Sequence, residues 1–133
     1  GYGRAEYYHP QRLMGTLMCH YRHHAHADPL WLPGLQDITA FVDFTAVAEA
    51  ADAAGMKLLG YTSQAQFLAA CGIDKLMAEV DPNDTRRFLT LANEAKRLML
   101  PGEMGERFKC IGFTRGVDGN VVGFTSRDFR SRL

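Results

Sequence analysis

The sequence lacks the features that mark secreted, membrane-spanning or zinc-stabilised proteins. It has only three cysteines (Cys19, Cys71 and Cys110), and no two of them form a Cys-x-x-Cys pair. An odd number without paired spacing argues against a disulfide framework and against a structural zinc site. No apolar run approaches the ~20 residues that a membrane helix needs, and the N-terminus lacks the order of a signal peptide. We therefore expect a reducing compartment and no membrane partner.

An excess of charge of either sign is also missing. The 133 residues include 15 Lys and Arg against 15 Asp and Glu, so the formal net charge is zero. This balance provides no basic face for nucleic acid, and we expect no nucleic-acid partner. With 47% hydrophobic and 23% charged residues, the composition is that of an ordinary globular domain.

Histidine is absent after residue 26. All five histidines lie within the first 26 residues, and the chain opens with Gly-Tyr-Gly and without a methionine. His20, His24 and His26 share strand parity, which makes a metal site a rival interpretation, because imidazole is the commonest metal ligand. No paired acid or cysteine accompanies them, so we predict no metal. The opening residues suggest either that a short N-terminal piece was removed or that the chain is the downstream part of a longer protein.

The first third of the chain shows few regular elements. Residues 1–14 have neither helical nor strand periodicity and are predicted to be a loop. Residues 15–22 alternate in character and predict a short strand. Residues 23–36 contain two prolines and a Pro-Gly pair, which predict a loop with Trp31 as its packing anchor.

The middle of the chain predicts a helix followed by a strand. Asp43 is a good N-cap for a helix over 44–54, and Gly55 would end it. Residues 56–61 form a short apolar run typical of a buried strand. This order is the second half of a βαβ unit.

The remainder predicts helices and a last strand. Ser63 would cap a helix that stops at Gly72, Asp74 would cap a short one, and Asp81-Pro82 would open a longer one. Residues 108–114 predict a second strand, 117–120 a turn and 121–124 a further short strand. We thus expect an α/β fold with an inserted helical pair, in a sheet too thin to be complete.

Four segments carry a resemblance to a known family: GTLMCHYRHHAH (15–26), PGLQDITAFVDFTAVAEAADAAG (33–55), YTSQAQFLAACGI (61–73) and MGERFKCIGFTR (104–115). Together they resemble the C-terminal portion of MidA-like S-adenosylmethionine (SAM)-dependent methyltransferases, the family of the mitochondrial complex I assembly-factor arginine methyltransferase. No single motif is diagnostic, but the combination is specific.

The resemblance implies the C-terminal part of a class I (Rossmann-like) methyltransferase sheet. It assigns 1–43 to a cleft-bordering loop and short strand, 44–61 to a helix and the sixth strand, 62–103 to a helical insertion, and 104–133 to the antiparallel seventh strand and a tail. The cofactor implied is SAM, bound mainly by residues upstream of Gly1, with Tyr2 and Gly3 at the edge of its site. The isolated chain should then be inactive.

The resemblance further implies a protein substrate, methylated on arginine, such as a respiratory complex I subunit or its bacterial counterpart. The compartment would be the bacterial cytoplasm or the mitochondrial matrix. An arginine guanidinium stays protonated and the methyl donor is also cationic, so carboxylates must orient the acceptor and help it lose a proton. Ligands of open α/β sheets bind outside the carboxyl ends of the strands, which the segment from Tyr2 to Phe44 should border.

The acids in that segment are Asp37 and Asp43, our candidate catalytic residues. Each has a simpler alternative, since Asp43 can be only an N-cap and Asp37 only a turn residue. Tyr21, Arg22 and His24 match the family's Tyr-Arg-x-His pattern and are the candidate substrate-binding residues. On a strand, Arg22 and His24 would share a face opposite Tyr21; alternatively, Arg22 and His24 brace the loop.

One position departs from the family's pattern. Phe41 stands where the family commonly has histidine, and this position is either catalytic or packed. A loss of catalysis would favour the alternative function, a non-catalytic interaction module that forms a homodimer through its exposed sheet edge.

Overall fold

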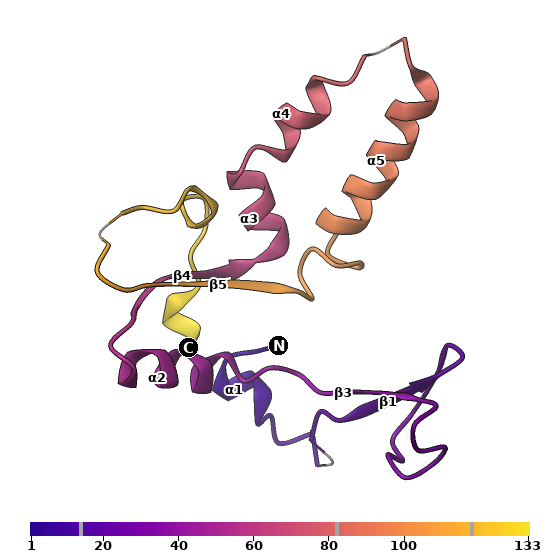
Figure 1. The fold of residues 1–133 in the computed structure, drawn as a ribbon, viewed down its shortest axis with the longest axis vertical. Helices are drawn as coiled ribbons and strands as arrows, with labels where there is room; N and C mark the ends of the chain where they lie inside the picture. The colour runs from indigo at the N-terminus through magenta and orange to yellow at the C-terminus, as the bar shows by residue number, and fades with distance from the viewer. Residues whose placement is uncertain (14, 82, 118) are drawn as a thin grey trace.

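The computed structural model describes residues 1–13, 15–81, 83–117 and 119–133 and has a mixed α/β fold, as expected (Figure 1). It contains a three-stranded sheet of order β2-β1-β3, a two-stranded sheet of β4 and β5, and a helical arm between β4 and β5. In chain order the elements are α1 (Arg4–Tyr7), β1 (Met18–Tyr21), β2 (His24–His26), β3 (Asp37–Thr39), α2 (Phe44–Ala53), β4 (Lys57–Ser63), α3 (Gln64–Ala70), α4 (Ile73–Ala78), α5 (Thr85–Met99), β5 (Lys109–Thr114) and the 3-10 helices η1 (Val122–Phe124) and η2 (Arg130–Arg132).

The three-stranded sheet corrects the prediction for residues 15–36. β1 ends at Tyr21 and pairs antiparallel with β2 and β3, so residues 23–36 are not simply a loop. Arg22 and His23 form the turn between β1 and β2, with φ of 46° and 68°. Positive φ at both central residues suits the twist of a hairpin. Because Arg22 is a turn residue, it does not share a strand face with His24, and that expectation was wrong.

The central helix and strand pair follow the prediction. The Asp43 carboxylate accepts a hydrogen bond from the Ala46 N–H at 3.0 Å, and Gly55, with φ +74°, follows the last turn of α2. β4 pairs antiparallel with β5 from Lys57 to Ser63, with one irregularity between Leu58 and Gly60. The predicted helix 44–54 and strands 56–61 and 108–114 are confirmed to within two residues at their ends.

In the described part of the insertion between β4 and β5 lie α3, α4 and α5, which match the three helices predicted one by one and correct the helical pair named for the fold as a whole. The Ser63 hydroxyl caps α3, as predicted, by accepting from the Gln66 N–H. Gly72, in the left-handed region with φ 86°, precedes α4. Asp74 therefore lies in the first turn of α4, and its predicted cap position was wrong.

The start of α5 also differs from the prediction. The carboxylate of Asp84 accepts from the Arg87 N–H at 3.0 Å and caps the helix. Asp81 instead accepts from the N–H of Asn83 in a local turn. The N-cap of α5 is therefore Asp84, three residues after the predicted Asp81. Pro82, placed at the helix start by the sequence, lies outside the described residues.

The C-terminal segment packs across the sheet and does not extend it. Gly60 and Gly112 pair across β4 and β5, and a Cβ at either would lie within 2.6 Å of the Phe124 ring. Residues 122–124 form η1, so the strand predicted over 121–124 was wrong. The Phe124 side chain covers the paired glycines and contacts the Phe67 ring edge-on at 5.3 Å. Asp118, in the predicted turn, lies outside the described residues.

Residues 1–14 were predicted to be a loop, but they contain α1. The amides of Glu6 and Tyr7 both donate to the carbonyl of Gly3. The Arg4 N–H donates to the Thr45 hydroxyl at 2.8 Å, and the Arg4 guanidinium pairs with Glu49, which raises the Arg4 pKa. These contacts hold α1 against the start of α2.

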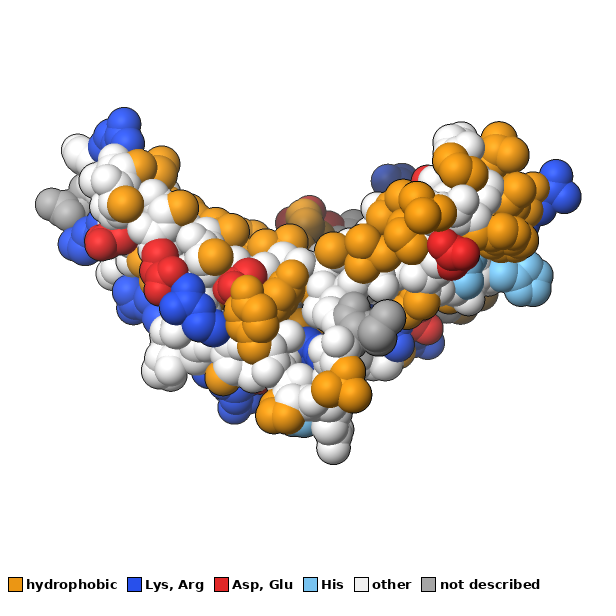
Figure 2. Space-filling model, turned by 90° about the horizontal axis from the view of Figure 1, so that it is seen from below, with side chains coloured by type: hydrophobic (Ala, Val, Ile, Leu, Met, Phe, Trp, Pro, Cys, Tyr) orange, Lys and Arg blue, Asp and Glu red, His pale blue; other side chains and the backbone are white. Residues whose placement is uncertain are grey.

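Few side chains are fully buried. Cys19 is 0% exposed and Tyr61 is 3% exposed, whereas many large apolar side chains lie at the surface. Figure 2 shows a crescent with apolar side chains along its hollow edge. No helix within the described ranges is long and apolar enough to span a bilayer. The described residues thus leave extensive apolar surface uncovered.

Candidate functional site

The predicted cofactor residue Tyr2 and the predicted catalytic residue Asp43 lie side by side. They form a single parallel bridge, in which the Tyr2 N–H donates to the Val42 carbonyl and the Phe44 N–H donates to the Tyr2 carbonyl, each at 2.9 Å. The bridge brings the start of the chain against the loop that leads into α2. The structure therefore joins two candidates that are 41 residues apart in sequence.

Asp43 has the structural role that the sequence offered as its alternative. Its Oδ1 caps α2, while Oδ2 has no hydrogen bond to any described residue. The negative charge of the carboxylate also interacts favourably with the positive end of the α2 dipole. Its place beside Tyr2 leaves the second oxygen for another partner, so the cap and a catalytic role are compatible.

Gly3 has a clear packing role. It is buried, and a Cβ at this position would lie 2.1 Å from the Arg132 carbonyl oxygen. Only glycine allows the C-terminal segment to approach so closely. The backbone of Arg132 thus covers Gly3 from one side, and Tyr2 offers the larger surface to a cofactor. The cofactor role of both residues remains a prediction.

Arg12 belongs to this site, although the sequence did not single it out. Its guanidinium lies 4.6 Å from the centre of the Tyr2 ring and 5.5 Å from that of Phe41, within the range of cation–π contacts. The two rings meet edge-on at 5.2 Å. Arg12 also donates to the Glu6 carbonyl at 2.6 Å. Phe41, the departure from the family's histidine, therefore packs within the site.

The predicted substrate-binding residues lie on the hairpin of the three-stranded sheet. Tyr21 is half-buried and contacts the ring of Trp31 edge-on, with the ring centres 6.0 Å apart. Arg22, in the turn, holds its guanidinium 5.4 Å from the Tyr21 ring centre. His24 pairs with Tyr21 across the hairpin and is exposed. The three side chains are thus neighbours on one hairpin, away from Tyr2 and Asp43.

Trp31 is the packing anchor that the sequence predicted. Besides Tyr21, it contacts the ring of His26 at 4.7 Å. Both His26 ring nitrogens are shielded from solvent and have no hydrogen-bond partner among the described residues. Across the residues that the structure describes, no group of three His, Cys, Asp or Glu side chains is placed to hold a metal ion. The histidine run therefore gains no support as a metal centre.

Asp37 is separated from Asp43. It opens β3, is exposed, and lies opposite His20 of β1. No hydrogen bond between described residues connects Asp37 to Asp43 or to Tyr2. The structure thus does not unite the two predicted catalytic carboxylates.

A pocket of about 340 Å³ lies between the two groups of candidates. Its lining includes Arg12, Thr16, Met18, His20, Thr39 and Phe41. The Phe41 N–H donates to the Thr16 hydroxyl at 3.1 Å, which ties the loop before α2 to the start of the small sheet. The pocket is therefore bordered on one side by Arg12 and Phe41 and on the other by β1, whose His20 pairs with Asp37.

Comparison with known proteins shows what this chain is similar to. Residues 1–62 match the model described as "Putative S-adenosyl-L-methionine-dependent methyltransferase". The chain is similar to a COG1565 superfamily member from Burkholderia thailandensis that was crystallised with S-adenosyl-homocysteine. The two are 54% identical over 100% of this chain and 34% of that chain, with a TM-score of 0.94.

A native crystal structure of a COG1565 superfamily protein from the same organism is also 54% identical to the chain. The match covers 100% of this chain and 36% of that chain, with a TM-score of 0.95. No curated protein matches the chain. The chain thus spans about a third of the length of the structures that it matches. Over its whole length the chain is similar in fold and in sequence to one portion of these COG1565 superfamily proteins, and its residues 1–62 match the model of a putative SAM-dependent methyltransferase family.

Proposed function

We propose that this chain forms the substrate-side part of a SAM-dependent methyltransferase that modifies arginine side chains of a protein. The 54% identity over the whole chain to a structure holding S-adenosyl-homocysteine carries this proposal. S-adenosyl-homocysteine is what remains of SAM once its methyl group has been transferred. The choice of arginine rests on the resemblance to the MidA-like family and on the chemistry of the site.

Most cofactor contacts would come from the rest of the natural polypeptide. Within the described residues, Gly3 is covered by the Arg132 carbonyl, and the chain contributes the ring of Tyr2 to such a site. β5 is paired on one edge only, with β4, in the described part of the chain. A strand added at its other edge would make β4 and β5 the border of a class I, Rossmann-like sheet.

The site residues suit a guanidinium acceptor. When bound, the cofactor supplies an electrophilic methyl group attached to a cationic sulfur. A carboxylate near the acceptor offsets the charge and can take up the proton that the guanidinium must lose. The Oδ2 of Asp43, which accepts no hydrogen bond from a described residue, is our first candidate for this role, and Asp37 is the second. The rings of Tyr2 and Phe41 already hold one guanidinium, that of Arg12.

Methyl transfer from labelled SAM tests the proposal. The natural polypeptide that carries this chain would be incubated with respiratory complex I subunits, or their bacterial counterparts, and the products mapped by mass spectrometry. We expect methyl groups on arginine. Methylation of another residue type would overturn the choice of acceptor, and no incorporation into any protein would overturn the protein substrate.

Two variants separate the roles of Asp43. Asn is as good an N-cap as Asp, so Asp43→Asn should change the free energy of unfolding by less than about 0.5 kcal/mol. If the carboxylate takes up the proton, methyl transfer should still fall by about 10²-fold or more. Asp43→Ala should lose both activity and about 1 kcal/mol of stability. Full activity of Asp43→Asn would leave Asp43 with the cap role alone.

A further inference from the structure

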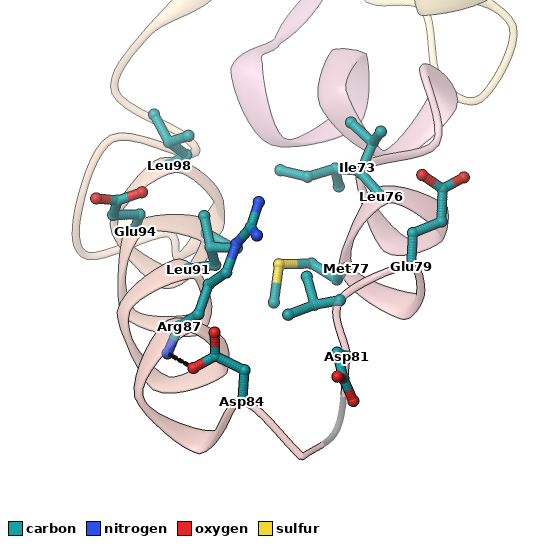
Figure 3. A pocket seen from close by; sticks show the side chains of 12 residues that line it. Ile73, Leu76, Met77, Glu79, Asp81, Asp84, Arg87, Leu91, Glu94 and Leu98 are labelled. Carbon is teal, nitrogen blue, oxygen red and sulfur yellow. Dashed lines mark hydrogen bonds between the residues drawn. The ribbon is translucent and has the colours of Figure 1, made fainter.

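A groove of about 620 Å³ runs between α4 and α5, on the helical arm (Figure 3). Its walls carry apolar side chains from both helices, including Ile73 and Met77 of α4 and Leu91 and Leu98 of α5. In Figure 3 the Met77 side chain points from α4 toward α5 across the open space. The helices thus face each other with apolar walls and do not close the space between them.

The apolar side chains follow helical spacing on each wall. Ile73 and Met77 of α4 are four residues apart, and Leu91, Ala95 and Leu98 of α5 are four and three residues apart. Val80 extends the apolar wall two residues beyond the end of α4. Such spacing places side chains on one face of a helix, and this face normally packs against another element. Here the two faces border a groove that remains open. The arrangement suits a third helix laid between them.

The groove carries an excess of negative charge. Its lining includes the four carboxylates of Glu79, Asp81, Asp84 and Glu94 against the single guanidinium of Arg87, a formal charge of −3. Asp81 and Asp84 use Oδ1 for local backbone hydrogen bonds, and their Oδ2 atoms have no hydrogen bond to a described residue. The ion pairs found in the described residues involve none of these carboxylates. A partner with basic side chains would supply the missing counter-charge.

We infer that the groove between α4 and α5 binds a basic amphipathic helix of the protein substrate. The helix would place apolar side chains between Met77 and Leu91 and direct Lys or Arg toward Glu79 and Glu94. Arg87, whose guanidinium points into the space between the helices in Figure 3, would donate to the backbone carbonyls at the end of the bound helix. That the partner is the protein substrate rests on the proposed function. That the groove prefers a basic helix rests only on its charge and its apolar walls.

The groove lies on a different element from the Tyr2–Asp43 site. Docking there would hold the substrate to the enzyme while its arginine reaches the site, which raises the effective concentration of the acceptor. The groove therefore predicts a lower KM for a protein that carries such a helix, with little effect on kcat.

Binding of a model peptide tests the inference without methyl transfer. The probe is a fluorescein-labelled, 18-residue peptide of Leu and Lys with an amphipathic helical pattern; the comparison peptide has Glu in place of Lys. Both are titrated into the natural polypeptide that carries this chain. We expect the Lys peptide to bind at least tenfold more tightly, and hydrogen exchange to slow only in α4 and α5.

Charge-reversal variants locate the site. Glu79→Lys with Glu94→Lys should weaken binding of the Lys peptide by about tenfold or more, because two attractions become repulsions. Glu103→Lys makes the same type of change at an exposed position outside the groove and should alter binding less than about twofold. Met77→Gln should weaken binding several-fold, whereas Leu89→Gln, on the exposed surface of α5, should not.

Equal binding by the groove variants and their controls would overturn the inference. It would also fail if the peptide did not bind and exchange in α4 and α5 were already slow, since the rest of the polypeptide or a second copy would then fill the groove. The proposed function is tested separately. Peptide binding without methyl transfer would support the binding groove and contradict the proposed function. Methyl transfer with an unchanged KM in the Glu79→Lys/Glu94→Lys variant would support the proposed function and contradict the binding groove.

Discussion

His23 occupies a backbone conformation that disfavours its side chain. With φ of 68° it follows Arg22 in the β1–β2 turn, where Asn-Gly would be the usual pair. A residue other than glycine in the left-handed region costs about 1 kcal/mol. The turn nevertheless presents Arg22 at the tip of the hairpin, next to Tyr21 and His24. Strain here is consistent with a binding role for the hairpin.

We expect His23→Gly to raise the free energy of unfolding by about 1 kcal/mol, because glycine accepts positive φ without strain. Urea unfolding of the natural polypeptide would measure the change. His20→Gly, inside β1, is the matched control and should lower stability. If His23→Gly also lowered stability, contacts of the imidazole would outweigh the backbone strain.

Tyr61 is expected to make the fold less stable as the pH rises above about 10. Burial raises the pKa of this phenol to about 12, above the value of about 10 in the unfolded chain. Below pH 10 both states keep the proton and stability is unaffected. As the pH rises from about 10 to 12, only the unfolded state ionises, so the free energy of unfolding falls by up to about 2.7 kcal/mol.

Tyr61→Phe should remove this alkaline loss and leave stability near pH 8 almost unchanged. Tyr8→Phe is the control, since Tyr8 is 68% exposed and should not alter the pH profile. Urea unfolding at pH 8 and pH 11 compares the three proteins. The same alkaline loss in Tyr61→Phe as in the parent would show that another group causes it.

Local contacts explain which residues could be predicted. Asp43 and Ser63 cap helices through N–H groups three residues away, so the sequence near them carries the signal. Arg12 depends instead on the rings of Tyr2 and Phe41, which are 39 residues apart in sequence and meet next to the parallel bridge. Nothing in the spacing of Arg12 could reveal that contact.

At the scale of elements, the length of each helix or strand decided whether the sequence could predict it. α2, β4 and β5 were found because each has a periodic pattern or a bounded apolar run. β2 and β3 have only three residues each, and the turn before β2 lacks glycine and asparagine. The segment 121–124 has a strand-like composition, but its helical turn is selected by the packing of Phe124 on distant glycines. Tertiary contacts overrode local preference there.

The contact of η1 with the strand pair can be tested at Gly112. A Cβ there would lie 2.6 Å from the Phe124 ring, so the ring must move away from the sheet. We expect Gly112→Ala to cost about 1–3 kcal/mol in the free energy of unfolding, as overpacking commonly does. Gly102→Ala, where a Cβ meets no atom within 4 Å, should change it by less than about 0.5 kcal/mol. Equal effects would mean that η1 is not held by this contact.

At the scale of the whole molecule, exposed apolar surface is the main feature. Leu13 is 91% exposed, Leu30 81% and Leu76 65%, whereas a folded monomer rarely leaves large apolar patches uncovered. We expect the 133-residue chain, produced alone, to bind a hydrophobic dye strongly. Calorimetry should detect no SAM binding at micromolar concentration, because under the proposed function most cofactor contacts come from outside this chain. Micromolar SAM binding by this chain would contradict our division of the site.

The pairing of Ser63 with Lys109 joins the two ends of the helical arm, so the 45 residues from 64 to 108 form a loop that the strands close. The entropy of closing a loop grows only with the logarithm of its length. Adding or removing ten residues at the far end of the arm would therefore change the closure free energy by only about 0.2 kcal/mol. The arm can thus diverge in length and sequence between relatives while β4 and β5 stay the same. If the groove between α4 and α5 binds substrate as we infer, substrate preference can change in the arm at almost no cost in closure free energy.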